Sequence, residues 1–180
     1  IPSRPTLWNQ DDNAQKKFEA LLLAGWSSQP PGITISPNSV KAVSRDVAWI
    51  VGNAAVVIKT TDAGATWSSV GASPLTGDLY NIEALDANVA FTTTTVGSTT
   101  SIWRTINGGT SWTQVYQATG FIDAVHMFDA TNGIALGDPV GGVWVILKTT
   151  DGGATWNPIA SPLPAVGSEA GWVNSLCVVG

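Results

Sequence analysis

The hydrophobic residues of this chain occur in short runs separated by polar, glycine-containing segments, and this arrangement returns three times. In each repeat an apolar run precedes a run that mixes apolar residues, threonine and one basic residue; the pairs are 47–52 with 56–61, 89–91 with 101–105, and 133–137 with 143–149. Short runs rich in β-branched and aromatic residues and bounded by turn residues are typical of strands. The pattern therefore predicts an all-β chain built from repeats.

A turn signature closes each repeat. It begins with Asp or Asn, has Gly two positions later and ends on Trp; its residues are Asp62, Gly64, Trp67, Asn107, Gly109, Trp112, Asp151, Gly153 and Trp156. A reversal is expected there, because Asp and Asn side chains bond the backbone two residues on and Gly accepts a positive φ. The tryptophans lie 45 and 44 residues apart, the spacing of four-stranded propeller blades. We expect each indole to pack one blade against its neighbour.

These turns resemble the Asp-box, or BNR repeat, whose pattern is Ser/Thr-x-Asp-x-Gly-x-Thr-Trp. In that family the box is a structural hairpin, which implies no catalytic role for Asp62, Asn107 or Asp151. The longer pattern is a strand ending in Val-Gly or Leu-Gly, then a Lys/Arg-Thr strand, then the box. It is similar to the propellers of the photosystem II stability and assembly factor family and to their secreted bacterial relatives, as is the stretch Gly137–Trp144. The resemblance covers about residues 39–180 and implies a fold rather than one function.

We therefore expect a β-propeller of four-stranded blades, with about three complete blades and a started fourth. The expected parts are an N-terminal extension at 1–38, blades at 39–80, 81–121 and 122–171, and the beginning of the next blade at 172–180. The innermost strands are predicted at 39–44, 81–86, 123–129 and 172–180. Cys177, in the last of these, is expected to be a small buried residue.

How the propeller is completed stays open at this point. The chain is either part of a propeller of about seven blades, or its first residues supply outer strands that close a ring of about four. Trp26-Ser27-Ser28 resembles Trp67-Ser68-Ser69, which suits closure, while residues 14–23 also fit a short helix capped by Asp11-Asp12-Asn13. If neither route closes the ring, two apolar blade faces are exposed and association with other chains is expected.

The composition limits the classes of partner that the chain is expected to bind. Charged residues make up 12% of the chain and the net charge is −5, against about 25% charged residues in typical domains. No basic stripe is present to neutralise phosphates, so nucleic-acid binding is disfavoured. No apolar run approaches the length of about 18 residues that a transmembrane segment needs. The surface composition and the secreted relatives together favour an extracytoplasmic location: secreted, periplasmic or cell surface.

Two sets of polar residues recur at fixed repeat positions. Lys41, Glu83 and His126 lie eight residues before Trp49, Phe91 and Ile134, so they share one repeat position. Each belongs to a predicted innermost strand, and in a propeller the innermost strands line the central channel. They are candidates for binding a small ligand or ion, or for a hydrated channel wall. Lys59, Arg104 and Lys148 lie eight residues before the three box tryptophans. A cation repeated in this way is expected to make a blade-edge or hairpin contact.

An enzyme would need residues outside the repeat. Sialidase chemistry requires three clustered arginines and a Tyr nucleophile, and the chain has only Arg4, Arg45 and Arg104. A glycosidase acid–base pair is the stronger alternative, with four candidate carboxylates in or near loops: Asp78, Asp123, Asp138 and Glu169. Asp138, between Gly137 and Pro139, is a candidate turn former or loop binding residue. No zinc spacing, EF-hand loop or phosphate-binding Gly loop is present, so no metal and no cofactor is predicted.

The sequence therefore favours a non-catalytic propeller that acts as a binding, assembly or structural module, with protein or glycan partners at its loops or channel mouth. A carbohydrate-active hydrolase is the first alternative. A self-assembling surface protein, in which neighbouring subunits complete the blades as a homo-oligomer, is the second.

Overall fold

In a computed structural model, residues 36–177 are described, and every regular element among them is a β-strand. These residues lie in one compact unit, Pro31–Gly180. The helix considered at 14–23 and the strand-like segments around Trp8 and Trp26 fall outside the described residues. Within residues 36–177 no helix is long and apolar enough to cross a membrane.

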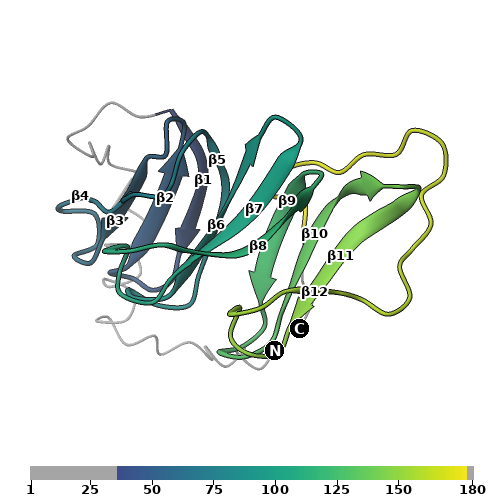
Figure 1. The fold of residues 1–180 in the computed structure, drawn as a ribbon. Coiled ribbons are helices and arrows are strands. Elements are labelled where there is room, and N and C mark those ends of the chain that lie inside the picture. Colours follow the sequence, from purple (N-terminus) through teal and green to yellow (C-terminus); the bar gives the residue numbers. More distant parts are fainter. Residues whose placement is uncertain (1–35, 178–180) are drawn as a thin grey trace, which may run out of the picture. The chain divides into compact units, whose positions relative to one another are not determined.

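The strands form three four-stranded antiparallel sheets that follow one another along the chain, each a propeller blade, and the predicted all-β partial propeller is confirmed. Figure 1 shows them side by side. Blade 1 contains β1 (Pro37–Ala42), β2 (Ala48–Gly52), β3 (Val57–Thr60) and β4 (Ser68–Ser69). Blade 2 contains β5 (Leu79–Ala84), β6 (Ala90–Val96), β7 (Thr99–Thr105) and β8 (Thr113–Thr119). Blade 3 contains β9 (Ile122–Met127), β10 (Gly133–Val140), β11 (Val143–Thr149) and β12 (Asn157–Pro158).

The inner strands β1, β5 and β9 each end two residues before the predicted limit. A polar side chain just beyond each strand accepts bonds from backbone amides two and three residues on: Ser44 Oγ from Asp46 and Val47, Asp86 Oδ1 from Asn88 and Val89, and Asp129 Oδ1 from Thr131 and Asn132. These bonds turn the chain early, since they satisfy amides that would otherwise continue the ladder.

The repeated turns, residues 60–67, 105–112 and 149–156, share one hydrogen-bond pattern. In the first, Asp62 Oδ1 accepts from Thr66 N at 2.8 Å, two residues farther along than predicted, and Thr60 Oγ1 accepts from Gly64 N at 2.9 Å. The other two turns repeat both bonds. Gly64, Gly109 and Gly153 have φ values of 85°, 88° and 75°, as the sequence predicted, because only glycine adopts this region without strain.

The tryptophans that end the second and third repeated turns pack on the preceding blade. Trp112 is 3% exposed and meets Trp49 of blade 1 edge-on, with ring centroids 6.4 Å apart. Trp156 is 5% exposed and meets Phe91 of blade 2 at 6.2 Å. The two hydrophobic cores of the described residues lie around these contacts, one between blades 1 and 2 and one between blades 2 and 3. The indoles thus contribute to both cores that join neighbouring blades.

Residues 172–177 differ from the expected inner strand. They contain a turn and no strand, and Cys177 is exposed rather than buried; residues 178–180 lie outside the described range. An inner strand needs a neighbouring strand to pair its amides and carbonyls, and the described residues provide none after β12. Without that pairing the segment folds back onto the existing inner strands.

Candidate functional site

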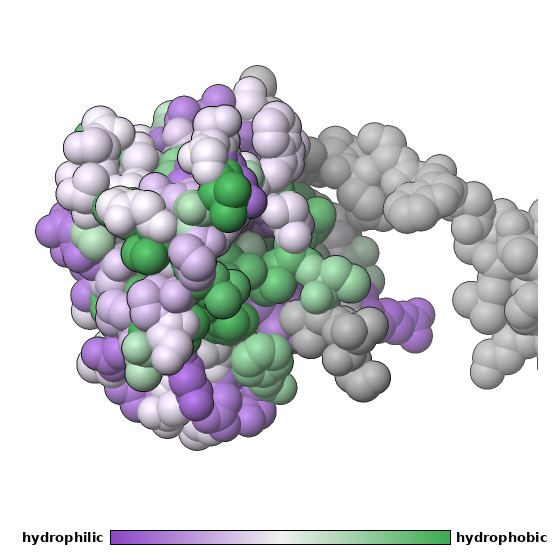
Figure 2. Space-filling view, turned by 90° about the vertical axis from the view of Figure 1, so that its right-hand side faces the viewer, coloured by the Kyte–Doolittle hydropathy of each residue, from purple (hydrophilic) through white to green (hydrophobic). Residues whose placement is uncertain are grey.

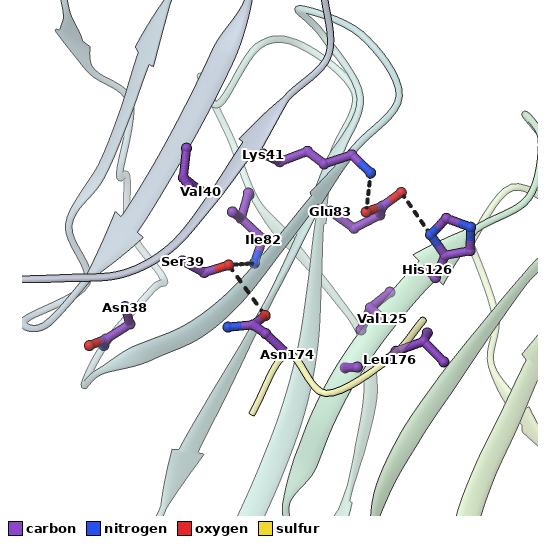
Figure 3. A pocket seen from close by; sticks show the side chains of 11 residues that line it. Asn38, Ser39, Val40, Lys41, Ile82, Glu83, Val125, His126, Asn174 and Leu176 are labelled. Atoms are coloured by element: carbon purple, nitrogen blue, oxygen red, sulfur yellow. Dashed lines mark hydrogen bonds and ion pairs between the residues drawn. The ribbon is translucent and has the colours of Figure 1, made fainter. Parts of the chain in front are cut away.

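Lys41, Glu83 and His126 come together in one row across the three inner strands. Each occupies the same register position, since Lys41 pairs with Trp49, Glu83 with Phe91 and His126 with Ile134. Lys41 Nζ lies 2.8 Å from Glu83 Oε2, and His126 Nδ1 lies 3.5 Å from Glu83 Oε1. Figure 3 shows the row, with Glu83 between the two basic side chains.

Glu83 is the buried member of the row. Its side chain is 7% exposed, against 31% for Lys41 and 26% for His126. The backbone amide of Met127 donates to Glu83 Oε1 at 3.4 Å, so three groups on two neighbouring strands face one carboxylate. A buried carboxylate requires such partners. Glu83 therefore positions Lys41 and His126, which are the side chains that a ligand can reach.

A groove of about 420 Å³ opens beside this row. Its walls carry polar and apolar side chains. The apolar ones include exposed Val40 on β1, Ile82 on β5 and Val125 on β9. Phe128 stands at the far end of the row, stacked edge-on against His126 with ring centroids 5.2 Å apart, and is 56% exposed. Exposed apolar side chains gathered in one place can mark an interaction site.

Asn174 fastens the segment after blade 3 across the groove. Its backbone amide donates to Asp123 O at 2.9 Å and its side-chain amide to Tyr80 O at 3.5 Å, while Ser39 Oγ donates to its Oδ1 at 3.3 Å. One residue thus contacts all three inner strands, and Leu176 lines the groove beside it. Nothing in the repeat pattern marks Asn174, because its contacts depend on the turn at 172–177.

Of the four carboxylates considered for a hydrolase, Asp123 and Asp138 lie near each other, on either side of Gly171. Asp78 accepts from Ala54 N in blade 1, and Glu169 accepts from Trp144 Nε1 and Val166 N near blade 3. Asp123 lies on β9, within the inner strand expected at 123–129, and Asp138 lies on β10, which continues to Val140, beyond the expected end at 137. Asp138 Oδ1 accepts from Gly171 N at 2.6 Å, which is a structural contact of the kind expected for a turn residue.

Asp123 is a buried carboxylate. It is 5% exposed, and its Oδ2 has no hydrogen-bond partner among the described residues. Burial, together with the nearby charge of Asp138, raises the pKa of Asp123 to about 6. The residue sits at a β-bulge opposite Gly137, and bulges redirect side chains. Gly171 covers Oδ2 so closely that an added Cβ would overlap it.

Lys59, Arg104 and Lys148 are the repeated basic residues that were expected to make blade-edge or hairpin contacts, and the first two contact the following blade. Lys59 Nζ donates to Ala87 O at 2.9 Å and Gly108 O at 3.0 Å, both in blade 2. Arg104 lies next to Gly152 in the turn of blade 3. Lys148 of blade 3 is exposed. Lys59 therefore holds the next turn in place and is a structural residue.

The groups around the inner-strand row limit the chemistry that it offers. Among residues 36–177 the hydrogen bonds and ion pairs of Glu83 and His126 include no Ser, Thr or Cys side chain, and no three His, Cys, Asp or Glu side chains are grouped as metal ligands would be. The accessible groups are an ammonium, an imidazole and apolar side chains. An ammonium group forms charge-assisted hydrogen bonds with carboxylates, and the apolar side chains offer contact area beside it.

Solved structures show where this fold occurs. The chain is similar to a structure of YCF48 bound to a D1 peptide, with a TM-score of 0.55, 20% identity and coverage of 73% of this chain and 42% of that one. YCF48 from Cyanidioschyzon merolae has a TM-score of 0.54 and 18% identity, with coverage of 75% of this chain and 43% of that one. A GH74 enzyme from Niastella koreensis has a TM-score of 0.51 and 20% identity, with coverage of 68% of this chain and 22% of that one. The chain thus spans less than half the length of these proteins, and the likeness concerns their propeller fold.

Sequence comparison is more specific. No curated protein sequence matches the chain. Residues 32–139, more than half of the chain, match the protein family described as photosynthesis system II assembly factor YCF48. That segment contains blades 1 and 2 with their repeated turns and most of β9 and β10, and so includes the row from Lys41 to His126. On this match, the chain belongs to the photosynthesis system II assembly factor YCF48 family.

Proposed function

We propose that this chain is a non-catalytic, extracytoplasmic module that binds a protein partner through the inner-strand groove. The observation that carries the proposal is the row in which buried Glu83 presents Lys41 and His126 at the edge of an open groove. The YCF48 structure bound to a D1 peptide supports a polypeptide as the ligand. The expected ligand is an extended segment with a carboxylate near an aliphatic or aromatic side chain.

The charges favour an anionic ligand group. Glu83 is already matched by Lys41 and by the Met127 amide, so an incoming carboxylate meets the outward face of Lys41 and His126. Val40 and Phe128, 65% and 56% exposed, offer apolar contact at the two sides. A hydrogen bond to a charged group contributes about 1.5 to 3 kcal/mol, enough for one such contact to dominate the affinity of a short peptide.

A peptide array tests this assignment directly. Fluorescently labelled peptides that combine Asp or Glu with Leu or Phe are titrated against the full chain and against Lys41→Gln, Glu83→Gln and Arg45→Gln. Arg45 is an exposed cation outside the groove and serves as the matched control. We expect the first two variants to raise Kd at least about tenfold, or about 1.4 kcal/mol, with Arg45→Gln unchanged. Equal affinities for all four proteins would refute the groove as the binding site.

A glycosidase remains the second candidate because of Asp123, whose raised pKa is typical of a general acid. Its position argues against that role, since Gly171 covers the carboxyl group. An assay of the full chain on a glycan panel, with Asp123→Asn and Asp138→Asn as variants, separates the two functions. Hydrolysis that either variant abolishes without loss of folding would favour the hydrolase.

A further inference from the structure

Blade 2 departs from the repeat on the face that packs toward blade 1. The residues nine and eleven positions before the Trp that ends each repeated turn are apolar in blades 1 and 3: Ile58 and Val56, and Leu147 and Val145. Blade 2 has Trp103 and Ser101 at these two positions. Trp103 packs against the core between blades 1 and 2. Because a position that serves the fold alone should keep its residue type in every blade, this change indicates a role beyond the scaffold.

The outer strand of blade 2 also differs from its counterparts. β8 has seven residues, whereas β4 and β12 have two each. A bulge in its pairing with β7 sets Gln114 opposite Trp103 and Gln117 opposite Ser101. Residues opposite each other share a face of the sheet, and a bulge redirects side chains. Two glutamines three residues apart are therefore placed on the face that carries Trp103.

A groove of about 370 Å³ lies over this face. Besides Trp103 and the two glutamines, its lining includes Thr99 of β7 and Thr76 of the segment that joins blades 1 and 2. The described residues that line it include no charged side chain. Its volume lies within the range of about 300 to 1,000 Å³ that is typical of small-molecule sites.

The groups in the groove are ordered and keep hydrogen-bonding capacity. Trp103 is half-buried, and its Nε1 donates to Thr94 Oγ1 at 3.0 Å, which holds the indole in place. Gln114 Nε2 donates to Ser101 Oγ at 2.9 Å. A glutamine amide offers an acceptor oxygen and a second N–H besides such a bond, and Gln114 and Gln117 are both exposed. The groove thus presents neutral donors and acceptors next to a fixed indole.

We propose that this groove binds a neutral sugar unit of a glycan. Sugar hydroxyls both donate and accept, as the Thr hydroxyls and Gln amides of the groove do. The C–H groups of a sugar ring suit an indole, because the ring face carries negative charge. An acidic sugar would lose hydration without meeting a cation among the lining residues. None of these residues lines the inner-strand groove, so this proposal is independent of peptide binding.

The groove suits a sugar better than it suits an apolar peptide side chain. On blade 3, a groove is lined mostly by apolar residues, among them Leu136, Trp144 and Ile146, and Figure 2 shows apolar residues gathered on that side of the described chain. In the blade 2 groove, Val96 and Trp103 are the only apolar side chains among the described lining residues. A ligand there must make most of its contacts with polar groups.

Calorimetric titration with defined oligosaccharides tests the site. The full chain is titrated with neutral tetramers of α-linked glucose, β-linked glucose, xylose and mannose, and with an acidic tetramer of galacturonate. Gln114→Ala and Gln117→Ala change exposed groove residues, and Trp103→Leu removes the indole. Thr113→Ala, at an exposed residue on the opposite face of β8, is the control. Circular dichroism confirms folding, and the glutamine variants keep the test informative if Trp103→Leu does not fold.

We expect the full chain to bind at least one neutral tetramer and not the galacturonate tetramer. Each glutamine variant should raise Kd about threefold to tenfold, as the loss of a neutral hydrogen bond does. Trp103→Leu should raise it at least about tenfold, and Thr113→Ala should leave it unchanged.

Three results would overturn the proposal. The first is that no neutral tetramer binds at millimolar concentration, or that the acidic one binds more tightly. The second is a bound neutral tetramer whose affinity neither Gln114→Ala nor Gln117→Ala weakens. The third is loss of peptide binding in these variants with no neutral tetramer bound, which would assign the groove to a polypeptide instead.

Discussion

At the scale of single residues, the repeated turns depend on backbone positions that only glycine satisfies. Gly153 has a φ of 75°, and a Cβ added there would overlap the ring of Phe91. Gly97 also has a positive φ, 62°, but has nothing within 4 Å of an added Cβ. The two positions therefore separate the cost of backbone strain from the cost of lost space.

Gly153→Ala is expected to destabilise the fold far more than Gly97→Ala. The strain of a positive φ, about 1 to 2 kcal/mol, applies to both, and overpacking against Phe91 adds about 1 to 3 kcal/mol at Gly153 alone. Urea unfolding of both variants gives the comparison. Equal losses of unfolding free energy would mean that the turn of blade 3 does not pack on Phe91.

Asp151 gives the repeated turns a defined pH dependence. Hydrogen bonds from the Thr155 side chain, the Thr155 backbone and the Thr149 side chain lower the pKa of Asp151 from 3.8 to about 2. Because the folded pKa lies below the unfolded one, this contribution is complete above about pH 4 and is lost as the pH falls toward 2. Asp151→Asn should flatten the fall in stability over this window, measured as urea midpoints. An unchanged slope would exclude Asp151 as a contributor.

At the scale of elements, the indole contacts between blades dominate. Trp112→Ala removes a side chain that is 3% exposed and packed on Trp49, and we expect it to lower the free energy of unfolding by about 3 to 5 kcal/mol. Trp172→Ala, at a site 81% exposed, should change it by no more than about 0.5 kcal/mol. Thermal and urea unfolding of the pair measure the difference. Similar losses would contradict radial packing of the blades.

The blades could be predicted from the sequence because each is specified by its own repeat. Strand pairing, the turn glycines and the burial of Trp112 and Trp156 follow from patterns within about 45 residues, the length of one repeat. The exact end of each inner strand could not be predicted. It depends on whether the side chain of Ser44, Asp86 or Asp129 accepts hydrogen bonds from the backbone amides that follow. The strand expected after residue 171 fails for a different reason, since residues 36–177 contain no strand that pairs with it.

The candidate site was predictable in part. Alignment of the repeats placed Lys41, Glu83 and His126 at one position, and adjacent inner strands bring such positions together. The burial of Asp123 depends on a bulge that adds one residue to β9, which no sequence spacing reveals. Asn174 contacts three strands through a single turn, so only the folded chain shows its role.

At the scale of the described unit, the inner strands place equivalent residues of successive blades in contact. The most direct measurement is a charge-exchange cycle on Lys41 and Glu83, in which Lys41→Glu, Glu83→Lys and the double variant are unfolded in urea. Lys41 Nζ and Glu83 Oε2 lie 2.8 Å apart, so each single change puts like charges side by side and the double change restores opposite charges at these two positions. We predict a coupling energy of about 1 kcal/mol, with the double variant more stable than either single one. Additivity within about 0.3 kcal/mol would show that β1 and β5 do not lie together as described.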